Sequence, residues 1–177
     1  AAGICGSDIP RIYRDGAHKM PLIPGHEFAG EVVGLGKRSD KGWLHKRVGI
    51  YPLIPCHSCT ACQKGQHEMC RQYGYLGSRR DGGFAEYVVV PQNNLIALPG
   101  CVSYEQAAML EPLSVAIHAM RRVPVVQNDT VTVCGLGTIG MLLVMLLWER
   151  GIENLLLIGN KEYQKQKVLA MGIPKEH

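Results

Sequence analysis

The chain has 177 residues, enough for one large domain or two small ones. Its apolar content of 46% and charged content of 19% are typical of a packed globular protein. The net charge of +4 is scattered, and the densest basic cluster, Arg79 and Arg80 beside Asp81, is too small for a nucleic-acid-binding face. The longest apolar run, Met141–Trp148, is far shorter than the roughly 20 residues of a membrane span. We therefore expect no nucleic-acid or membrane partner, and a cytoplasmic protein.

The first hundred residues are predicted to be mostly β-structure interrupted by glycine and proline. Residues 5–21 include Pro10 and Gly16 and have mixed polarity, which predicts loop and turn. Small and apolar residues alternate with polar ones over Pro24–Gly36, which favours a strand that bends at its glycines. Three further strands are expected, at Arg47–Tyr51, Phe84–Val90 and Asn94–Leu98.

Four cysteines with the spacing C-x2-C-x2-C-x7-C form the densest group of metal-ligand residues in the chain. They are Cys56, Cys59, Cys62 and Cys70. Four thiolates so close in sequence can surround one tetrahedral zinc ion, and such a closed shell leaves no position for substrate. The alternatives are two disulfides, which need an oxidising compartment, and an iron–sulfur cluster. The sequence on either side of the cysteines favours structural zinc.

Helical patterns begin at Ser103, where a glutamine three residues later completes a capping-box signature. Helices are predicted over 104–110 and 113–122, the second with a proline at its start and two arginines at its end. A strand is expected over 130–134, a helix up to residue 150, a second strand over 155–158 and a helix over 162–171. This order of strand, Gly-rich turn, helix, strand and helix is the first half of a doubly wound nucleotide-binding domain.

The Gly-rich turn has the pattern G-x-G-x-x-G, and it lies between a predicted strand and a predicted helix. In that context the glycines allow a tight turn, a close approach of pyrophosphate and close packing of the helix, whose N-terminus attracts phosphate. A tight turn without any ligand is the alternative. The predicted coenzyme-binding residues in this turn are Gly135, Leu136, Gly137, Thr138, Ile139 and Gly140.

A second group of candidate metal ligands is dispersed along the chain: Cys5, His26, Glu27 and Glu111. A thiolate, an imidazole and a carboxylate can bind a catalytic zinc that keeps an open position. Residue types alone do not decide whether this site exists. A cysteine such as Cys5 is also common as a small buried apolar residue, and His26 and Glu27 are also compatible with a solvated strand edge.

An ordered set of motifs resembles the zinc-containing medium-chain dehydrogenases. The set comprises Gly3–Asp8, Pro24–Glu27, the four cysteines, Arg80–Tyr87, Glu111–Ser114 and the Gly-rich turn. Within that family, Pro10–His18 and Gly77–Gly83 resemble most closely the galactitol-1-phosphate 5-dehydrogenases, and sorbitol and threonine dehydrogenases share the wider pattern.

The resemblance implies a mixed α/β fold with two domains. Residues 1–122 would form an incomplete, mainly β, GroES-like catalytic domain with a structural zinc lobe at about 52–72. Residues 123–177 would form the first part of a Rossmann NAD(P)-binding domain. Because members of this family extend beyond both ends of this sequence, we expect a fragment that is inactive by itself.

The resemblance also implies roles for single residues. Cys5 and His26 match protein ligands of a catalytic zinc, and Glu27 and Glu111 match carboxylates that hold the zinc or its water. Asp8 matches the carboxylate that orients the histidine ligand.

Two further assignments follow from the same resemblance. Ser7 matches the hydroxyl that passes on the substrate proton, although the histidine that often continues this relay is replaced by Pro10. The four clustered cysteines match the structural zinc site.

The implied function is zinc-dependent, NAD(P)-linked oxidation of a secondary alcohol in a polyol or polyol phosphate, in a homo-oligomer such as a dimer or tetramer. The alternative enzyme is a dehydrogenase of L-threonine or of another secondary alcohol. The alternative to an enzyme is a catalytically silent relative that binds zinc and nucleotide. Arg79 and Arg80 are either contacts to a substrate phosphate or solvated loop charges.

Coenzyme choice is expected to depend on the end of the second nucleotide-domain strand. NAD-binding members usually carry an acidic residue there, about twenty residues after the turn. In this chain Gly159 takes that place, followed by Asn160 and Lys161. The missing carboxylate favours NADP, whereas Glu162 close by leaves NAD open.

Overall fold

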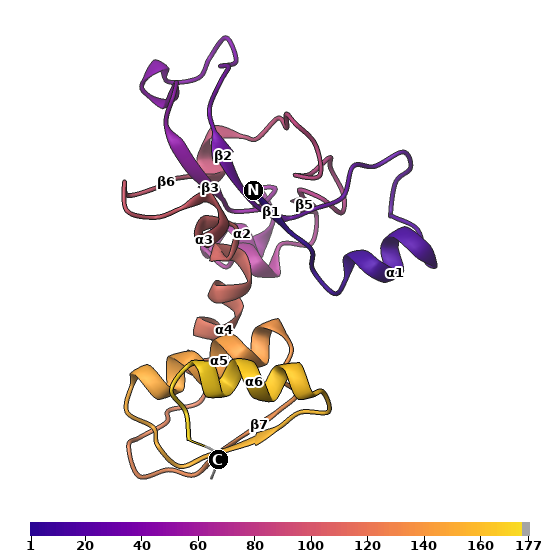
Figure 1. Cartoon of the computed structure of the whole chain (residues 1–177). Coiled ribbons are helices and arrows are strands. Elements are labelled where there is room, and N and C mark those ends of the chain that lie inside the picture. Colours follow the sequence, from indigo (N-terminus) through magenta and orange to yellow (C-terminus); the bar gives the residue numbers. More distant parts are fainter. Residues whose placement is uncertain (175–177) are drawn as a thin grey trace. The chain divides into compact units, whose positions relative to one another are not determined.

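The computed structural model describes residues 1–174 and divides into two compact units, Ala1–Glu111 and a second unit that begins at Pro112 (Figure 1). The division falls inside helix α4 (Leu110–Arg122). The domain boundary expected after residue 122 stays a prediction. Among the described residues, no helix has the length and apolarity needed to cross a membrane.

The first unit is built on a four-stranded antiparallel sheet with the order β1-β2-β3-β6 (Figure 1). Its strands are β1 (Ala2–Gly3), β2 (Glu27–Glu31), β3 (Arg47–Ile50) and β6 (Leu95–Ala97). Three of them confirm predicted strands, and β2 is shorter than predicted because its pairing with β3 ends at Glu31. The buried core of this unit comprises Phe28, Val48, Ile50 and Leu76.

The segment with the four cysteines leaves the sheet between two short paired strands, β4 (Leu53–Ile54) and β5 (Gly74–Tyr75). Between them lie one turn of α-helix, α2 (Thr60–Gln63), and the 3-10 turn η2 (His67–Met69). Two other 3-10 turns, η1 (Lys41–Trp43) and η3 (Gln92–Asn94), connect strands of the sheet. The β4–β5 pair closes the base of the cysteine loop and fixes Tyr75 opposite Leu53.

The prediction of loop and turn throughout residues 5–21 is wrong over Asp8–Tyr13, which form helix α1. Pro10 did not prevent the helix because it is the third helical residue, in the first turn, where a backbone N–H has no helical partner. Asp8 starts the helix, where a carboxylate is favoured by the helix dipole.

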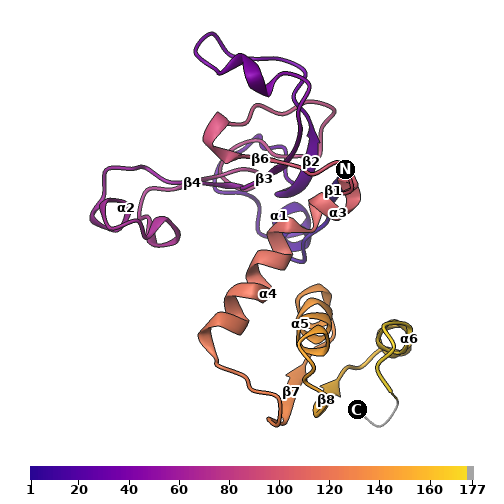
Figure 2. The ribbon, with the colours of Figure 1, turned by 90° about the vertical axis from the view of Figure 1, so that its left-hand side faces the viewer.

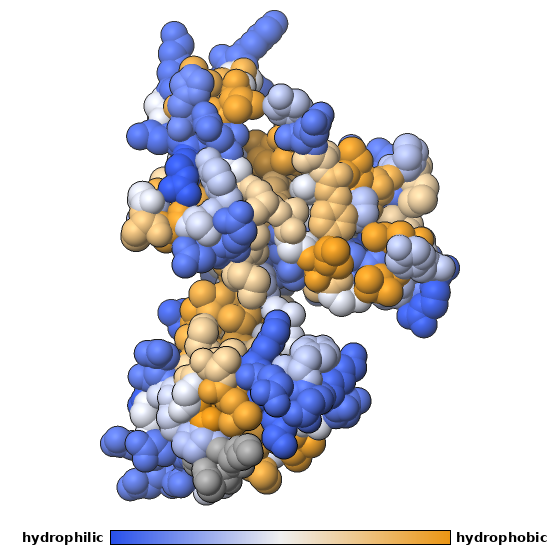
Figure 3. All heavy atoms as spheres, in the orientation of Figure 1, coloured by the Kyte–Doolittle hydropathy of each residue, from blue (hydrophilic) through white to orange (hydrophobic). Residues whose placement is uncertain are grey.

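The strand predicted over Phe84–Val90 is also wrong, because no described strand pairs with it. The exposure of its side chains nevertheless alternates over residues 87–90 as it would in a strand. Val88 and Val90 pack against the core, whereas Tyr87 and Val89 are 75% and 93% exposed. Exposed hydrophobic residues are common on this protein, and the face drawn in Figure 3 mixes hydrophobic with hydrophilic side chains. Alternation reports an extended segment with one buried face, and a strand additionally needs a neighbour for its backbone hydrogen bonds.

Helix α3 (Tyr104–Ala108) begins with the predicted capping box. Ser103 Oγ accepts from the N–H of Gln106 at 3.1 Å, and Gln106 Oε1 accepts from the N–H of Ser103 at 2.9 Å. Helix α4 starts at Leu110, earlier than predicted, because Pro112 lies in its first turn and needs no hydrogen-bond donor there. This places Glu111 at the beginning of a helix.

The second unit contains the predicted strand–turn–helix–strand–helix order (Figure 2). Strands β7 (Val131–Cys134) and β8 (Leu155–Ile158) are parallel, with helix α5 (Thr138–Glu149) between them and helix α6 (Glu162–Ala170) after them. Each of these elements contributes to one buried core, which includes Val133, Val144, Leu155 and Val168. The mixed α/β fold class is confirmed.

Candidate functional site

The thiols of Cys56, Cys59, Cys62 and Cys70 all lie within 4.8 Å of one another. Cys62 and Cys70 are buried and the other two are half-buried. Backbone N–H groups also point at the sulfurs: that of Cys56 donates to Cys70 Sγ at 3.3 Å and that of Cys59 to Cys56 Sγ at 3.4 Å. Four sulfurs around one point suit a single tetrahedral ion better than two separate disulfide pairs.

The clustered thiols differ in acidity. Hydrogen bonds from the Ser58 hydroxyl and from nearby backbone N–H groups lower the pKa of Cys56 to about 5. Burial raises the pKa of Cys62 to about 12. Since only thiolates bind metal strongly, a metal ion entering this cluster must displace the proton of Cys62.

A second cluster lies at the edge of the sheet, where a thiol, an imidazole and a carboxylate oxygen from Cys5, His26 and Glu27 lie within 4.8 Å of one another. The β1–β2 register explains the encounter, because it places Gly3 opposite Glu27 and therefore brings Cys5 to the start of β2. His26 and Glu27 are each 6% exposed. Thiolate, imidazole and carboxylate are a donor set that catalytic zinc uses.

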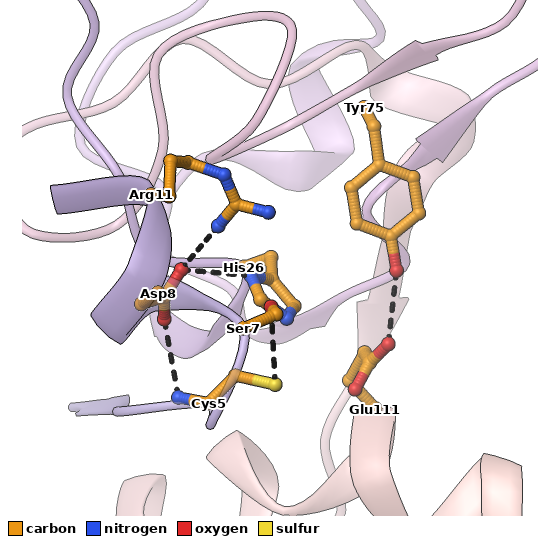
Figure 4. A network of polar contacts seen from close by, with 7 residues as sticks. All are labelled: Cys5, Ser7, Asp8, Arg11, His26, Tyr75 and Glu111. Carbon is orange, nitrogen blue, oxygen red and sulfur yellow. Dashed lines mark hydrogen bonds and ion pairs between the residues drawn. The ribbon is translucent and has the colours of Figure 1, made fainter. Parts of the chain in front are cut away.

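Asp8 is fully buried and lies beside His26, between Arg11 and Cys5 (Figure 4). Its Oδ2 accepts from the N–H of Cys5 at 3.1 Å, and its Oδ1 accepts from Arg11 at 2.6 Å and lies 3.5 Å from His26 Nδ1. That nitrogen has no hydrogen-bond partner within 1–174, although it is buried. The Ser7 hydroxyl donates to Cys5 Sγ at 3.4 Å and is exposed.

Glu111 does not join the group formed by Cys5, His26 and Glu27. Its Oε1 accepts a hydrogen bond of 2.9 Å from the hydroxyl of Tyr75 (Figure 4). Burial, and next the charge of Glu111, raise the pKa of Tyr75 well above its usual range, so the phenol keeps its proton. Burial also raises the pKa of Glu27, with smaller increases from the charges of Glu111 and Asp8, against lowering by Cys5 and His26.

The loop that carries His26 is held by the Asp-Gly-Gly part of the Arg80–Tyr87 motif. The N–H of Ile23 donates to Asp81 Oδ1 at 3.0 Å, the N–H of Gly82 to Ile23 O at 2.8 Å, and the N–H of Gly83 to Gly25 O at 2.8 Å. These residues therefore have a structural role beside the cluster.

Arg79 and Arg80, directly before the Asp-Gly-Gly sequence, are exposed. Arg79 lies over the ring of Tyr73 at 4.5 Å and donates to its hydroxyl at 3.4 Å. The Arg80 Nε lies against Gly74, 3.0 Å from where a Cβ there would be. The stacking holds the Arg79 side chain in place at the surface, where it could contact an anion.

The Gly-rich turn has the geometry that its sequence predicts. Gly135 has a φ of +95°, which favours glycine, and its N–H donates to Ile158 O at 2.8 Å across to β8. A Cβ at Gly140 would meet the carbonyl oxygen of Gly135. Gly137 is the N-cap of α5 and has no side chain to cap the helix, so the first N–H groups of a twelve-residue helix lack a side-chain acceptor.

The other three residues of the turn are distributed between core and surface. Leu136 is buried in the core of the second unit, Thr138 is exposed and Ile139 is half-buried.

The end of β8 holds an unusual contact between Gly159 and the side chain of Gln164. A Cβ at Gly159 would lie 2.9 Å from Gln164 Oε1 and 2.9 Å from Leu136 Cδ1. Gln164 Oε1 is buried and has no hydrogen-bond partner within 1–174. Asn160 and Lys161 are exposed, with the Lys161 amine 5.8 Å from the Tyr163 ring.

Sequence reasoning missed Tyr75, Arg11 and Gln164. Arg11 follows Asp8 by three residues in a helix, and that spacing would have indicated their contact if the helix had been predicted. Tyr75 and Glu111 are 36 residues apart, and no local pattern connects them.

Comparison with known proteins gives one matching family model and many relatives. The alcohol dehydrogenase GroES-like domain matches residues 1–100. Galactitol 1-phosphate 5-dehydrogenase of Escherichia coli K12 is 40% identical over 158 residues, which are 89% of this chain and 46% of that protein. Sorbitol dehydrogenase of Bacillus subtilis 168 is 35% identical, with coverage of 97% of this chain and 50% of that protein.

Solved structures agree with the sequence relatives. A zinc-binding dehydrogenase from Sinorhizobium meliloti 1021, bound to NADP, matches with a TM-score of 0.90 and 32% identity over 97% of this chain and 50% of that chain. The chain described here thus spans about half the length of these relatives.

Proposed function

The chain belongs to the alcohol dehydrogenase GroES-like family, among the zinc-containing medium-chain dehydrogenases, and on that premise we propose a function for the whole protein. It oxidises a secondary alcohol of a polyol or polyol phosphate, such as galactitol 1-phosphate, with NAD(P) as hydride acceptor. The observation that carries this proposal is the convergence of Cys5, His26 and Glu27 within 4.8 Å at the sheet edge.

The residues of this cluster fit a zinc ion. Asp8 faces Nδ1 of His26, which leaves Nε2 as the metal-binding nitrogen, and a carboxylate behind a ligating imidazole raises its basicity. Cys5 supplies a thiolate and Glu27 a carboxylate that is buried beside them. When bound there, zinc supplies a Lewis acid that lowers the pKa of an alcohol hydroxyl.

Ser7 is the group that takes the substrate proton in this proposal. Its hydroxyl is exposed and already lies beside the Cys5 sulfur at 3.4 Å, so it can exchange that contact for a substrate oxygen. Pro10 follows three residues later and has no proton to relay, so we expect the proton to leave from Ser7 to solvent.

The four clustered cysteines hold a structural zinc in the same proposal. Their sulfurs leave no open position once four bonds are made, and this separates them from the cluster at Cys5. The lobe contributes to folding and takes no part in hydride transfer.

The coenzyme binds at the Gly-rich turn before α5, where unpaired N–H groups and the helix dipole attract its pyrophosphate. The absence of a carboxylate at Gly159 removes the repulsion of a 2′-phosphate, which favours NADP. Solved relatives carry either coenzyme, NADP in the S. meliloti dehydrogenase and NADH in an Escherichia coli CFT073 alcohol dehydrogenase, so the expected preference depends on Gly159.

A substrate panel on the full-length protein tests the proposal. Galactitol 1-phosphate, galactitol, sorbitol and L-threonine are offered with each coenzyme, and formation of the reduced nicotinamide is followed. We expect turnover of a polyol or its phosphate, lost in His26→Ala while coenzyme still binds, and retained in the exposed control His18→Ala. Wild-type turnover by His26→Ala, or turnover of L-threonine alone, would contradict the proposal.

A further inference from the structure

The backbone of Tyr75 is unusually well fixed for a residue in a two-residue strand. It pairs with Leu53 in the β4–β5 ladder. Its carbonyl oxygen accepts from three successive N–H groups, those of Ser78, Arg79 and Arg80, at 3.3, 2.9 and 3.0 Å. The aromatic side chain therefore projects from a rigid base.

The Tyr75 side chain points its hydroxyl at the Glu111 carboxylate (Figure 4). Its ring meets the His26 ring edge-on at 5.8 Å and the Tyr73 ring edge-on at 6.3 Å. Its hydroxyl donates to Glu111 Oε1 at 2.9 Å. A phenol hydroxyl donates one hydrogen bond, and here its acceptor is a carboxylate oxygen. Such a charge-assisted hydrogen bond is stronger than one between neutral groups.

We propose that Tyr75 is a positioning residue that holds Glu111 beside the metal-ligand cluster and out of it, so that Glu27 completes the protein ligands of the resting metal. The inference rests on the proposed function, because it assumes a metal at Cys5 and His26. It is supported by the grouping of ligand atoms, which includes Glu27 and leaves out Glu111. The family motif alone left both carboxylates as candidates.

Replacing Tyr75 with phenylalanine removes the donor and keeps the ring contacts with His26 and Tyr73. Glu111, the charged acceptor, then loses a hydrogen bond whose strength corresponds to a factor of about 10 to 100 in an equilibrium constant. The Glu111 carboxylate is close enough to influence the Glu27 carboxyl, and a divalent ion in the cluster would attract it.

The test uses the full-length protein with cobalt(II) in the cluster and zinc kept in the four-cysteine lobe. The dissociation constant and visible spectrum of cobalt(II) are measured for wild type, Tyr75→Phe, Glu27→Gln and the double variant. We expect about 10-fold tighter binding and an altered ligand-field spectrum in Tyr75→Phe. Glu27→Gln should weaken binding about 100-fold, and adding Tyr75→Phe should recover at least about 10-fold of that loss.

Two control variants keep the result interpretable. Glu111→Gln with Tyr75 intact should change cobalt(II) affinity by less than about twofold, since Glu111 is not a resting ligand, and it should abolish the recovery in the double variant. Tyr73→Phe, which removes a hydroxyl that accepts from Arg79, should match the wild type.

Contrary results distinguish a wrong role for Tyr75 from a wrong metal site. Normal cobalt(II) binding in wild type with no change in Tyr75→Phe, or loss of binding in Glu111→Gln, overturns the role of Tyr75 alone. Cobalt(II) uptake that is unaffected by Cys5→Ser overturns the proposed metal site, and the role of Tyr75 with it.

Discussion

Oδ1 of Asp8 lies 3.5 Å from Nδ1 of His26, and Asp8 is fully buried. The same oxygen accepts from Arg11 at 2.6 Å, so the carboxylate is neutralised on one side while it faces the imidazole on the other. A buried carboxylate in this position is held by its partners, since an unpaired one would be costly. Because Asp8 faces Nδ1, Nε2 is the ring nitrogen that remains for the proposed metal.

Asp8→Asn should weaken metal binding at the Cys5–His26 cluster by about 10- to 100-fold, because the neutral amide no longer raises the basicity of the imidazole. Metal titration of the stripped full-length protein gives this number. Asp15→Asn, an exposed aspartate on the same segment, is the matched control and should behave as wild type. Equal affinity in Asp8→Asn and Asp15→Asn would show that Asp8 does not act on the metal.

Cys62→Ser should remove one zinc ion per chain and unfold the lobe, because binding of structural zinc contributes on the order of 10 kcal/mol. Native mass spectrometry counts the ions, and proteolysis within residues 56–70 reports the unfolding. The exposed Cys101→Ser is the control and should keep the full metal content. An unchanged zinc count in Cys62→Ser would refute the structural site.

Glu27→Gln should stabilise the metal-free protein at neutral pH. Burial raises the pKa of Glu27, so between its ordinary and its raised pKa the folded chain holds more protons than the unfolded chain. The stability of the metal-free wild type therefore falls as pH rises through that window, and glutamine removes this loss. In thermal unfolding, the midpoints of Glu27→Gln and of the metal-free wild type should coincide at low pH and separate toward neutral pH. Glu153→Gln, at an exposed glutamate, is the control and should follow the wild type throughout. Parallel curves for Glu27→Gln and wild type would contradict the prediction.

Gly159→Asp should raise the preference for NAD over NADP by about 10-fold or more, because a carboxylate there repels a 2′-phosphate. The effect should be larger with Gln164→Ala, since the new Cβ would otherwise meet the Gln164 side chain at 2.9 Å. The ratio of kcat/KM values for the two coenzymes is measured for the single and double variants. A strong NAD preference in wild type that neither substitution moves would disprove this interpretation.

Arg79→Ala should raise KM for a phosphorylated polyol and leave KM for the plain polyol unchanged, if the guanidinium held over Tyr73 binds phosphate. Loss of one charge-assisted hydrogen bond should change the ratio of these two KM values by about 10-fold. Arg38→Ala, another exposed arginine, is the control. If the two Michaelis constants keep the same ratio in Arg79→Ala, the arginine is a solvated loop charge.

Local sequence patterns determined much of this protein. The capping box at Ser103 and the turn at Gly135–Gly140 follow from contacts between residues close in sequence, and the strands on either side of α5 follow from their own β-prone sequences. The cysteine spacing likewise places four sulfurs in one short loop. These features depend on backbone preferences and short loops, which can be predicted from the local sequence.

Tertiary structure decided the rest. Cys5 meets Glu27 because the β1–β2 register pairs Gly3 with Glu27, and Tyr75 reaches Glu111 across 36 residues of chain. The β-prone run Phe84–Val90 formed no strand, because backbone pairing needs a neighbouring strand that a local pattern does not report. Register, long-range contacts and strand partners are properties of how distant segments pack, so the residues that surround each candidate ligand became visible only in the folded chain.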